Sequence, residues 1–267
     1  MDRTGAKGLV VVTGASGGIG YELAKLFARD GWPLLLAARS GDKLTTFASE
    51  LTAAHNVPVA VCAVDLAKPD SPTQLCEAAK RQDRPIGVLV NNAGFGRYGP
   101  FVRADLDDAL QILQVNIVAL TQLTRLVLPE MVQRNEGRIM NVASTAAFQA
   151  GPLMAVYYAS KAYVLHFSEA LDAELRKTKV GVSAFCPGPT ATGFEARAGM
   201  GESKLFTGRH VISAAAAAAV GYRGLMQGQR VVIPGLWNNL LVQSNRIFPR
   251  RWITRVVQWM QRRRKAE

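Results

Sequence analysis

The chain has 267 residues, of which 49% are hydrophobic, and a formal net charge of +12. This length allows one large α/β domain or two small ones, and the apolar fraction excludes extended disorder. No segment resembles a signal peptide, and no apolar run reaches the roughly eighteen residues of a transmembrane helix. The three scattered cysteines favour reduced thiols in a cytoplasmic protein, and the three histidines lack the spacing of metal ligands, so no metal site is expected.

The positive charge is concentrated at the C-terminal end. From Arg246 onward there are eight Lys or Arg residues against one acid, Glu267. A basic segment of this kind is typical of proteins that bind nucleic acid, anionic lipid or a phosphorylated cofactor. The rest of the chain is only mildly basic.

Short apolar runs alternate with helical patterns along most of the chain. The runs predict strands at 8–13, 33–38, 57–64, 86–90, 138–142, 180–185 and 230–234. Helices are expected between them, including a long one at 105–134 that Pro129 should bend or interrupt near its end. This alternation predicts an α/β fold, a Rossmann-like doubly wound parallel sheet of about seven strands with helices on both faces. Ligands of such sheets bind beyond the carboxyl ends of the strands.

A glycine-rich turn follows the first predicted strand. Gly14-Ala-Ser-Gly-Gly-Ile-Gly20 leads directly into a helical segment at 21–29. Glycines in this context let a pyrophosphate approach the backbone N–H groups at a helix N-terminus. The spacing G-x-x-x-G-x-G differs from the commonest dinucleotide fingerprint, and glycines that merely permit tight packing are the alternative.

Two positions at the next strand ends bear on the choice of dinucleotide. Arg39 stands where a site for NAD usually has an acid, and a guanidinium suits the 2′-phosphate of NADP. We therefore expect NADP(H) in preference to NAD(H), unless Arg39 is a solvated loop residue. Asp65 can either accept a hydrogen bond from adenine or cap the following turn, and the sequence leaves both alternatives open.

A stretch without any charged side chain runs from Ile139 to Ser160 and ends at Lys161. Tyr157 precedes Lys161 by four residues, so on a helix the phenol and the ammonium lie on one face. A neighbouring cation favours the phenolate and would lower the tyrosine pKa from about 10, which suits proton transfer to or from an alcohol oxygen. An isolated Tyr–Lys pair on the surface is the plain alternative. Asn116 lies on the apolar face of the long helix, where a buried amide requires hydrogen-bond partners. An asparagine that is simply packed and hydrogen-bonded is the plain alternative.

Together these residues resemble the short-chain dehydrogenase/reductase family. The resemblance covers roughly residues 8–195 and rests on T-G-A-S-G-G-I-G at 13–20, Asp65, N-N-A-G at 91–94, Asn116, Ser144, Tyr157-x-x-x-Lys161 and P-G-P-T-A-T at 187–192. The separation of Ser144 from Tyr157 selects Tyr157 rather than Tyr158 as the catalytic tyrosine. The flanking sequences are also similar to bacterial members that resemble 17β-hydroxysteroid and 3-oxoacyl reductases.

The resemblance implies a role for each matching position. Tyr157 would exchange a proton with the substrate oxygen, Ser144 would hydrogen-bond that oxygen, Lys161 would lower the tyrosine pKa and bind the nicotinamide ribose, and Asn116 would hold a water on the proton path. The residues implied in cofactor binding are Gly14, Ser16, Gly18, Ile19, Gly20, Arg39, Asp65, Leu66, Asn91, Ala93, Tyr157, Lys161, Pro187, Gly188 and Thr190.

The implied activity is NADP(H)-dependent interconversion of a carbonyl and an alcohol, in a homodimer or homotetramer. A protein that senses NADP(H) without turnover, or one recruited to a membrane through its tail, is the alternative. The segment 193–210 would form a lid over the substrate, in which Phe194, Met200, Leu205 and Phe206 suggest an apolar ketone or aldehyde.

The family's domain would end near residue 235, and residues 236–267 would form a basic amphipathic extension. Trp252, Val256 and Trp259 recur at helical spacing among arginines. Three alternatives are open for this helix: docking on its own or a partner subunit, peripheral contact of 246–265 with the inner face of a membrane, or binding of nucleic acid. Tryptophan beside arginine favours lipid over nucleic acid, and no nucleic-acid partner is expected.

Overall fold

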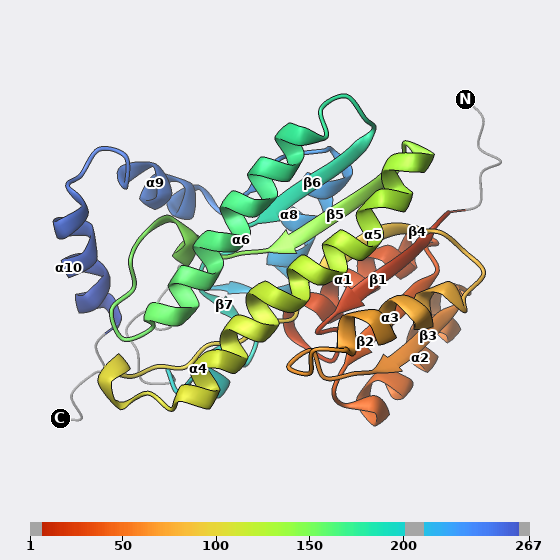
Figure 1. Cartoon of the computed structure of the whole chain (residues 1–267), viewed down its shortest axis with the longest axis horizontal. Coiled ribbons are helices and arrows are strands. Elements are labelled where there is room, and N and C mark those ends of the chain that lie inside the picture. Colours follow the sequence, from red (N-terminus) through yellow and green to blue (C-terminus); the bar gives the residue numbers. More distant parts are fainter. Residues whose placement is uncertain (1–6, 201–210, 262–267) are drawn as a thin grey trace.

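A seven-stranded parallel sheet lies at the centre of the protein (Figure 1). The structure, a computed structural model, describes residues 7–200 and 211–261. The strand order is β3-β2-β1-β4-β5-β6-β9, and every neighbouring pair is parallel. The strands are β1 (Leu9–Thr13), β2 (Leu34–Ala38), β3 (Val59–Ala63), β4 (Ile86–Asn91), β5 (Gly137–Val142), β6 (Val180–Phe185) and β9 (Val231–Val232). The prediction of a Rossmann-like doubly wound sheet is confirmed.

The central strands are apolar at every position because both faces of the sheet are covered. In β1, Val10 and Val12 face one hydrophobic cluster, whereas Leu9 and Val11 face the other. This division follows from the two-residue period of side chains along a strand. All five residues of β1 are buried, which explains a continuous apolar run instead of an alternating one.

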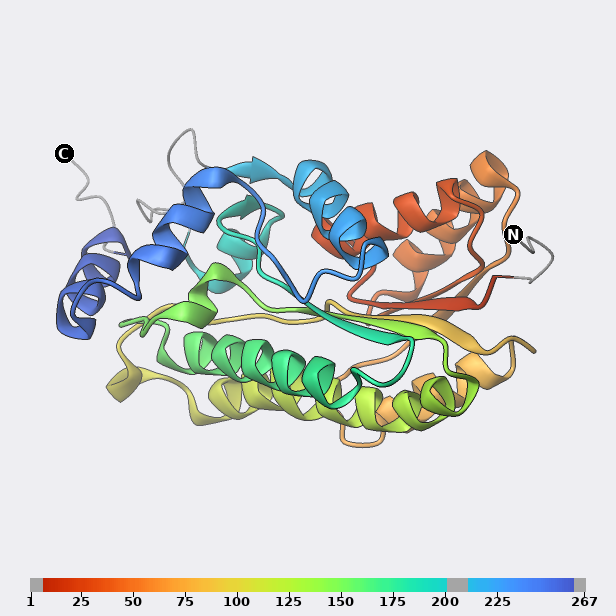
Figure 2. The ribbon, with the colours of Figure 1, turned by 90° about the horizontal axis from the view of Figure 1, so that it is seen from above.

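Helices form a layer on each face of the sheet (Figure 2). One layer contains α1 (Gly18–Arg29), α2 (Gly41–His55) and α8 (Ala214–Met226). The other contains α3 (Ser71–Lys80), α5 (Leu120–Arg134) and α6 (Ala155–Glu174). The alanine-rich α8 lies close to the sheet, since Ala217 and Ala218 are fully buried there.

The long helix expected at 105–134 consists of three segments. They are α4 (Leu106–Leu113), the π-helical segment η2 (Gln114–Ala119) and α5. The expected interruption at Pro129 is wrong, because α5 continues through this residue to Arg134. Pro129 lies on the exposed side of α5, where water can solvate the carbonyl that loses its helical partner. The irregularity occurs instead around Asn116.

Among the described helices, Leu106–Arg134 is long and apolar enough to cross a membrane by length and composition alone. Its Ile112, Leu123 and Met131 are buried, and the latter two belong to the cluster beneath the sheet. These contacts are those of a core helix.

Short elements connect the sheet to the C-terminal part of the chain. They are η1 (Phe101–Arg103), η3 (Thr145–Phe148), α7 (Phe194–Ala198) and a small sheet of β7 (Thr190–Ala191) and β8 (Ile212–Ser213). Of the lid expected at 193–210, residues 201–210, including Leu205 and Phe206, lie outside the described residues.

The C-terminal extension forms two helices, α9 (Leu236–Ser244) and α10 (Arg250–Gln261), at one end of the molecule (Figures 1 and 2). Val257 and Gln261 of α10 are buried and Ile253 is partly buried. The stripe of Trp252, Val256 and Trp259 lies on an adjacent, exposed side, so it is not the face that packs against the rest of the chain. The helix docks on its own chain through the neighbouring face.

Candidate active site

A cavity of about 1090 Å³ lies beyond the carboxyl ends of the central strands. Residues that follow β1, β4, β5 and β6 line it, together with residues of α6, α7, α9 and α10. A parallel sheet brings the ends of these strands to one edge. The cavity therefore collects most of the motifs that are far apart in the sequence.

The glycine turn forms one wall of this cavity. Gly14 and Gly18 have φ angles of +64° and +59°, a conformation that strains residues with a side chain. The first turn of α1 has neither a capping side chain nor an acid, and a Cβ added at Gly17 would meet nothing within 4 Å. An anion can thus approach the free N–H groups at the N-terminus of α1. The turn fits the pyrophosphate of a dinucleotide.

Hydrogen bonds between the ends of β1 and β4 fix the glycine turn, and the sequence analysis did not predict them. The Asn92 side chain donates to the carbonyls of Thr13 (2.9 Å) and Gly14 (3.1 Å). The Thr13 hydroxyl accepts from the N–H groups of Asn92 and Ala93, both at 3.0 Å. A Cβ on Gly20 would lie 2.4 Å from the Asn92 amide nitrogen, so the absence of a side chain at Gly20 leaves space for the Asn92 side chain.

Two cations lie where the adenosine end of a dinucleotide would sit. Arg39 and Lys43 both line the cavity, on either side of Ser40 at the start of α2. Lys43 was not predicted; its position in the first turn of the helix after Arg39 is the signal that could have identified it. Asp65 and Leu66 line the same region, and the Asp65 carboxylate also accepts from the Ala67 N–H at 3.1 Å. The structure thus shows Asp65 capping the following turn, and its hydrogen bond to adenine stays a prediction.

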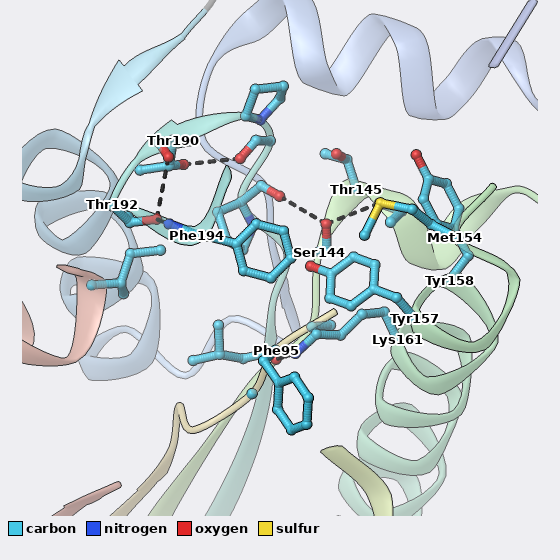
Figure 3. Close-up of a pocket in the computed structure, with 18 of the residues that line it drawn as sticks. Phe95, Ser144, Thr145, Met154, Tyr157, Tyr158, Lys161, Thr190, Thr192 and Phe194 are labelled. Carbon is cyan, nitrogen blue, oxygen red and sulfur yellow. Dashed lines mark hydrogen bonds between the residues drawn. The ribbon is translucent and has the colours of Figure 1, made fainter. Parts of the chain in front are cut away.

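Tyr157 and Ser144 face each other at the other end of the cavity. Figure 3 shows the phenol of Tyr157 pointing toward the Ser144 hydroxyl, whereas the phenol of Tyr158 points away from it. The Ser144 hydroxyl accepts from the Ala146 N–H at 3.1 Å and contacts the Pro187 carbonyl at 3.4 Å. The Tyr158 hydroxyl accepts from the Gln261 amide at 2.6 Å. The choice of Tyr157 over Tyr158 agrees with this geometry.

Burial controls the protonation of Tyr157 more than Lys161 does. Burial raises the pKa of Tyr157 above its usual value, while the hydrogen bond with Ser144 acts in the opposite direction. The expected net lowering of this pKa by the lysine is therefore wrong, because the effect of burial is larger. The partly buried phenol has less water to stabilise its anion, and the Lys161 ammonium donates to a backbone carbonyl.

Lys161 is buried beside Tyr157. Its Nζ donates to the Val142 carbonyl at 2.7 Å and lies 5.8 Å from the centre of the Tyr157 ring. Burial lowers the pKa of Lys161 to about 8. The lysine and tyrosine thus form the expected pair, with an ammonium that titrates closer to neutrality than usual.

Asn116 fixes the loop after β4, close to Lys161. Its side-chain amide bonds both backbone groups of Phe95, at 3.1 and 3.0 Å, and donates to the Ser160 hydroxyl at 2.9 Å. The π-helical turn of η2 contains Asn116, and such turns are frequent at functional sites. A Cβ on Gly94 would lie 3.1 Å from Asn116 Oδ1 and 3.3 Å from Lys161 Nζ, so a larger residue would crowd both groups.

The segment after β6 closes the cofactor side of the cavity. Pro187, Gly188 and Thr190 line the cavity, and the Thr190 hydroxyl donates to the Gly188 carbonyl at 2.9 Å. A Cβ on Gly188 would lie 2.6 Å from the side chain of Asn238 in α9. The P-G-P-T segment therefore also packs against α9 of the C-terminal extension.

Three residues expected at the site do not line the cavity: Gly20, Asn91 and Asn116. The Asn91 side chain is buried and donates to Thr124 (3.1 Å) and Asn141 (2.9 Å), so its assignment as a cofactor-binding side chain is not supported. The adjacent Asn92 and Ala93 line the cavity instead. Within residues 7–200 and 211–261, no group of three or more potential metal ligands occurs.

An apolar chamber surrounds the phenol of Tyr157 on the side away from the glycine turn. Met154 and Tyr158 form this chamber with Met200, which follows α7, and Val257 of α10. Phe194 of α7 packs against Tyr157 with 5.2 Å between the ring centres. The chamber thus joins the first part of the lid to the C-terminal helix.

The family model described as short chain dehydrogenase matches residues 8–202. The chain belongs to the short-chain dehydrogenase family.

Individual short-chain dehydrogenases are also similar to this one. A very-long-chain 3-oxoacyl-CoA reductase from Anas platyrhynchos is 37% identical over 186 residues, which are 68% of this chain and 59% of the relative. The match therefore spans less than two thirds of that relative. A short-chain dehydrogenase from Sphingobium yanoikuyae in complex with NADPH is 33% identical, with a TM-score of 0.80 and coverage of 90% of this chain and 94% of that one. A bulky-bulky ketone specific alcohol dehydrogenase from Comamonas testosteroni is 29% identical, with a TM-score of 0.77 and coverage of 91% and 94%.

Proposed function

We propose that this short-chain dehydrogenase is a reductase of a bulky, apolar ketone or aldehyde, and that it uses NADPH. The observation that carries the proposal is the position of the Tyr157 phenol. It faces Ser144, lies beside Lys161 and opens into a cavity that continues to the glycine turn. When bound, the dinucleotide supplies the hydride for the carbonyl carbon.

The side chains around the phenol provide the proton and stabilise the charge. Tyr157 remains neutral near pH 7, because burial raises its pKa, and can donate its proton to the carbonyl oxygen. Ser144 is placed to hydrogen-bond the same oxygen as negative charge develops on it. Lys161, cationic below about pH 8, favours the resulting phenolate. A neutral phenol supports reduction, since alcohol oxidation would require it to lose a proton first.

The preference for NADP(H) is supported by the charges near the start of α2. Arg39 and Lys43 line the cavity where the adenosine 2′-position would lie, and no acid occupies position 39. A guanidinium forms paired hydrogen bonds with phosphate oxygens, and a lysine adds a point charge. The solved relative that contains NADPH agrees with this preference.

The size and lining of the cavity support a bulky substrate. Its volume of about 1090 Å³ lies just above the usual range for a pocket with one ligand, so it can hold a dinucleotide and part of a substrate. Met154, Met200 and Val257 give the substrate side an apolar lining. Relatives named for 3-oxoacyl-CoA and for bulky ketones make long-chain 3-oxo compounds and steroid ketones the first substrates to test.

The test is the oxidation of NADPH with three groups of carbonyl compounds: long-chain 3-oxo compounds, steroid ketones and small aldehydes. Wild-type protein should reduce bulky ketones with a higher kcat/KM than small aldehydes. Tyr157→Phe should lose at least about a hundredfold in kcat, because the proton donor is absent. Tyr163→Phe, on the exposed part of the same helix, is the matched control.

The same experiment distinguishes catalysis from NADP(H) sensing. A protein that binds NADPH but reduces none of the compounds would support the regulatory alternative. Equal rates for wild type and Tyr157→Phe would refute the assigned proton donor.

A further inference from the structure

Helices α9 and α10 lie at one end of the molecule (Figure 2). These helices and the segment between them expose several large apolar side chains. We call this set the C-terminal apolar surface, and it consists of Trp237, Leu240, Ile247, Phe248, Trp252 and Val256. Ile247 is 79% exposed and Trp252 is 63% exposed. These side chains are exposed to water, whereas the adjacent side of α10 is buried. Several large exposed apolar side chains on one part of the chain indicate an interaction surface.

Positive charge accompanies this surface. Arg246, Arg250, Arg251 and Arg255 are all exposed, and none of them forms a salt bridge within the described parts of the chain. The sequence contains no acidic residue between positions 211 and 266. The surface is therefore complementary to a negatively charged partner.

The C-terminal apolar surface continues into the active-site cavity. Trp237, Phe248, Trp252 and Val256 are exposed, yet they also line the cavity. Ile253 and Val257, on the inner side of α10, extend the lining to the cluster around Tyr157. An apolar molecule can thus pass from this surface to the phenol along apolar side chains.

We propose that α9 and α10 bind the surface of an anionic lipid bilayer and that the carbonyl substrate enters the cavity from the lipid. Tryptophan and arginine side chains together occupy the interface between headgroups and acyl chains, and clustered arginines select anionic lipids. A second copy of the chain is a poor occupant, because the unpaired arginines of both copies would face each other. Nucleic acid would use the arginines but not the six apolar side chains. The substrate-entry part rests on the proposed reductase activity; the membrane-binding part does not.

Sedimentation of the full-length protein with lipid vesicles tests the binding. Vesicles of phosphatidylcholine alone are compared with vesicles that also contain phosphatidylglycerol. The protein should bind the anionic vesicles and lose binding as salt is added. Each arginine near such a surface contributes roughly a factor of five, so Arg250→Gln/Arg251→Gln should weaken binding at least about tenfold.

Matched variants identify the surface that binds. Ile247→Ser/Trp252→Ser should also weaken binding, because it removes two exposed apolar side chains. Arg176→Gln/Lys177→Gln, just after α6, and Val61→Ser on β3 change exposed residues elsewhere and should bind like wild type. Equal binding to neutral and anionic vesicles, or equal losses in the control variants, would overturn the proposal.

The entry route is tested separately from both membrane binding and catalysis. Wild type should reduce a ketone dissolved in anionic vesicles several times faster than Arg250→Gln/Arg251→Gln, and both should reduce a water-soluble ketone equally. Equal loss with both ketones would refute entry from the lipid. Tyr157→Phe should bind vesicles like wild type, because membrane binding does not depend on the proton donor. The sedimentation result therefore remains valid even if the proposed reductase activity is refuted.

Discussion

The titratable side chains of the site respond mainly to the exclusion of water. Burial raises the pKa of Tyr157 and lowers that of Lys161 to about 8, so both shifts favour the neutral form. Near pH 7 the phenol keeps its proton and the lysine keeps its charge. The phenol therefore holds the proton needed for reduction, and the neighbouring ammonium stabilises the phenolate that forms when this proton is transferred.

A pH profile tests this pairing. The kcat/KM for ketone reduction should fall as the pH rises through about 8, because Lys161 then loses the charge that favours the phenolate. A lysine in water titrates near 10.5, so the position of the break reports burial. The measurement is kcat/KM from about pH 6 to about pH 10 with a ketone that has no titratable group. A flat profile across this range would contradict the role of Lys161.

Arg39 is expected to determine the choice of dinucleotide. Arg39→Asp should lower the ratio of kcat/KM for NADPH to that for NADH at least about tenfold, since a charge-assisted hydrogen bond contributes about 1.5–3 kcal/mol. The ratio is measured for wild type, Arg39→Asp and Lys43→Asp. Arg176→Asp, remote from the cavity, provides the control. An unchanged ratio in Arg39→Asp would show that the 2′-phosphate is bound by other residues.

At this scale the sequence could predict the residues that strand ends deliver to the sheet edge, but not every orientation. Successive residues of a strand point to opposite faces, and this separates Asn91, the last residue of β4, from Asn92. Asn91 turns into the core toward Thr124, whereas Asn92 holds the glycine turn. A motif of two adjacent asparagines does not reveal which one faces the ligand.

At the scale of elements, α10 combines two roles that its sequence pattern does not separate. Its inner side packs Ile253 and Val257 against the cluster around Tyr157. Its last described residue, Gln261, donates to the Tyr158 hydroxyl and accepts from the Tyr98 hydroxyl through its backbone carbonyl, at 2.6 and 2.9 Å. The helix therefore forms a wall of the substrate chamber.

Loss of the Gln261 side chain should loosen this wall. Gln261→Leu removes the bond to Tyr158, which corresponds to about 1 kcal/mol or roughly a fivefold change in an equilibrium constant. We expect the KM for a bulky ketone to rise severalfold with little change for a small aldehyde, and steady-state kinetics on both compounds measure it. Gln258→Leu, on the exposed side of α10, is the control. An equal change in KM for both compounds would argue against a wall for bulky substrates.

The boundaries of the central elements were predictable, whereas the irregular ones were not. Continuous apolar runs at 8–13 and 33–38 correspond to strands that helices cover on both faces. The π-helical turn at Asn116 depends on tertiary hydrogen bonds to Phe95 and Ser160, which no local pattern reveals. In α10, apolar residues occur on two adjacent sides, so the regular spacing of Trp252, Val256 and Trp259 identified the exposed side rather than the buried one.

At the scale of the whole molecule, the strand order creates the site. The chain reverses direction across the sheet between β1 and β4, and the cavity opens beyond these strands. Pyrophosphate-binding residues come from β1, whereas the proton donor lies on α6, more than a hundred residues later in the chain. The sequence could predict this arrangement because parallel strands place all their carboxyl ends at one edge.

A second set of exposed apolar side chains bears on assembly. Leu106 and Leu110 of α4 and Leu126 of α5 are 68%, 53% and 49% exposed. We expect these helices to contact a second copy of the chain, in line with the expected homodimer or homotetramer. Light scattering after size exclusion should give a dimer or larger for wild type and a monomer for Leu110→Asp/Leu126→Asp. A monomeric wild type at micromolar concentration would contradict this expectation.

The central claim is that Tyr157 delivers a proton to a carbonyl oxygen as hydride reaches the carbonyl carbon. Its most direct test is a single-turnover reaction of the protein with NADPH, deuterated at the transferable position, and a bulky ketone, followed by mass analysis of the alcohol. The account predicts one deuterium at the former carbonyl carbon with wild type, and no alcohol on the same timescale with Tyr157→Phe that has bound the same amount of NADPH. Alcohol without deuterium, or equal yields from the two proteins, would contradict it.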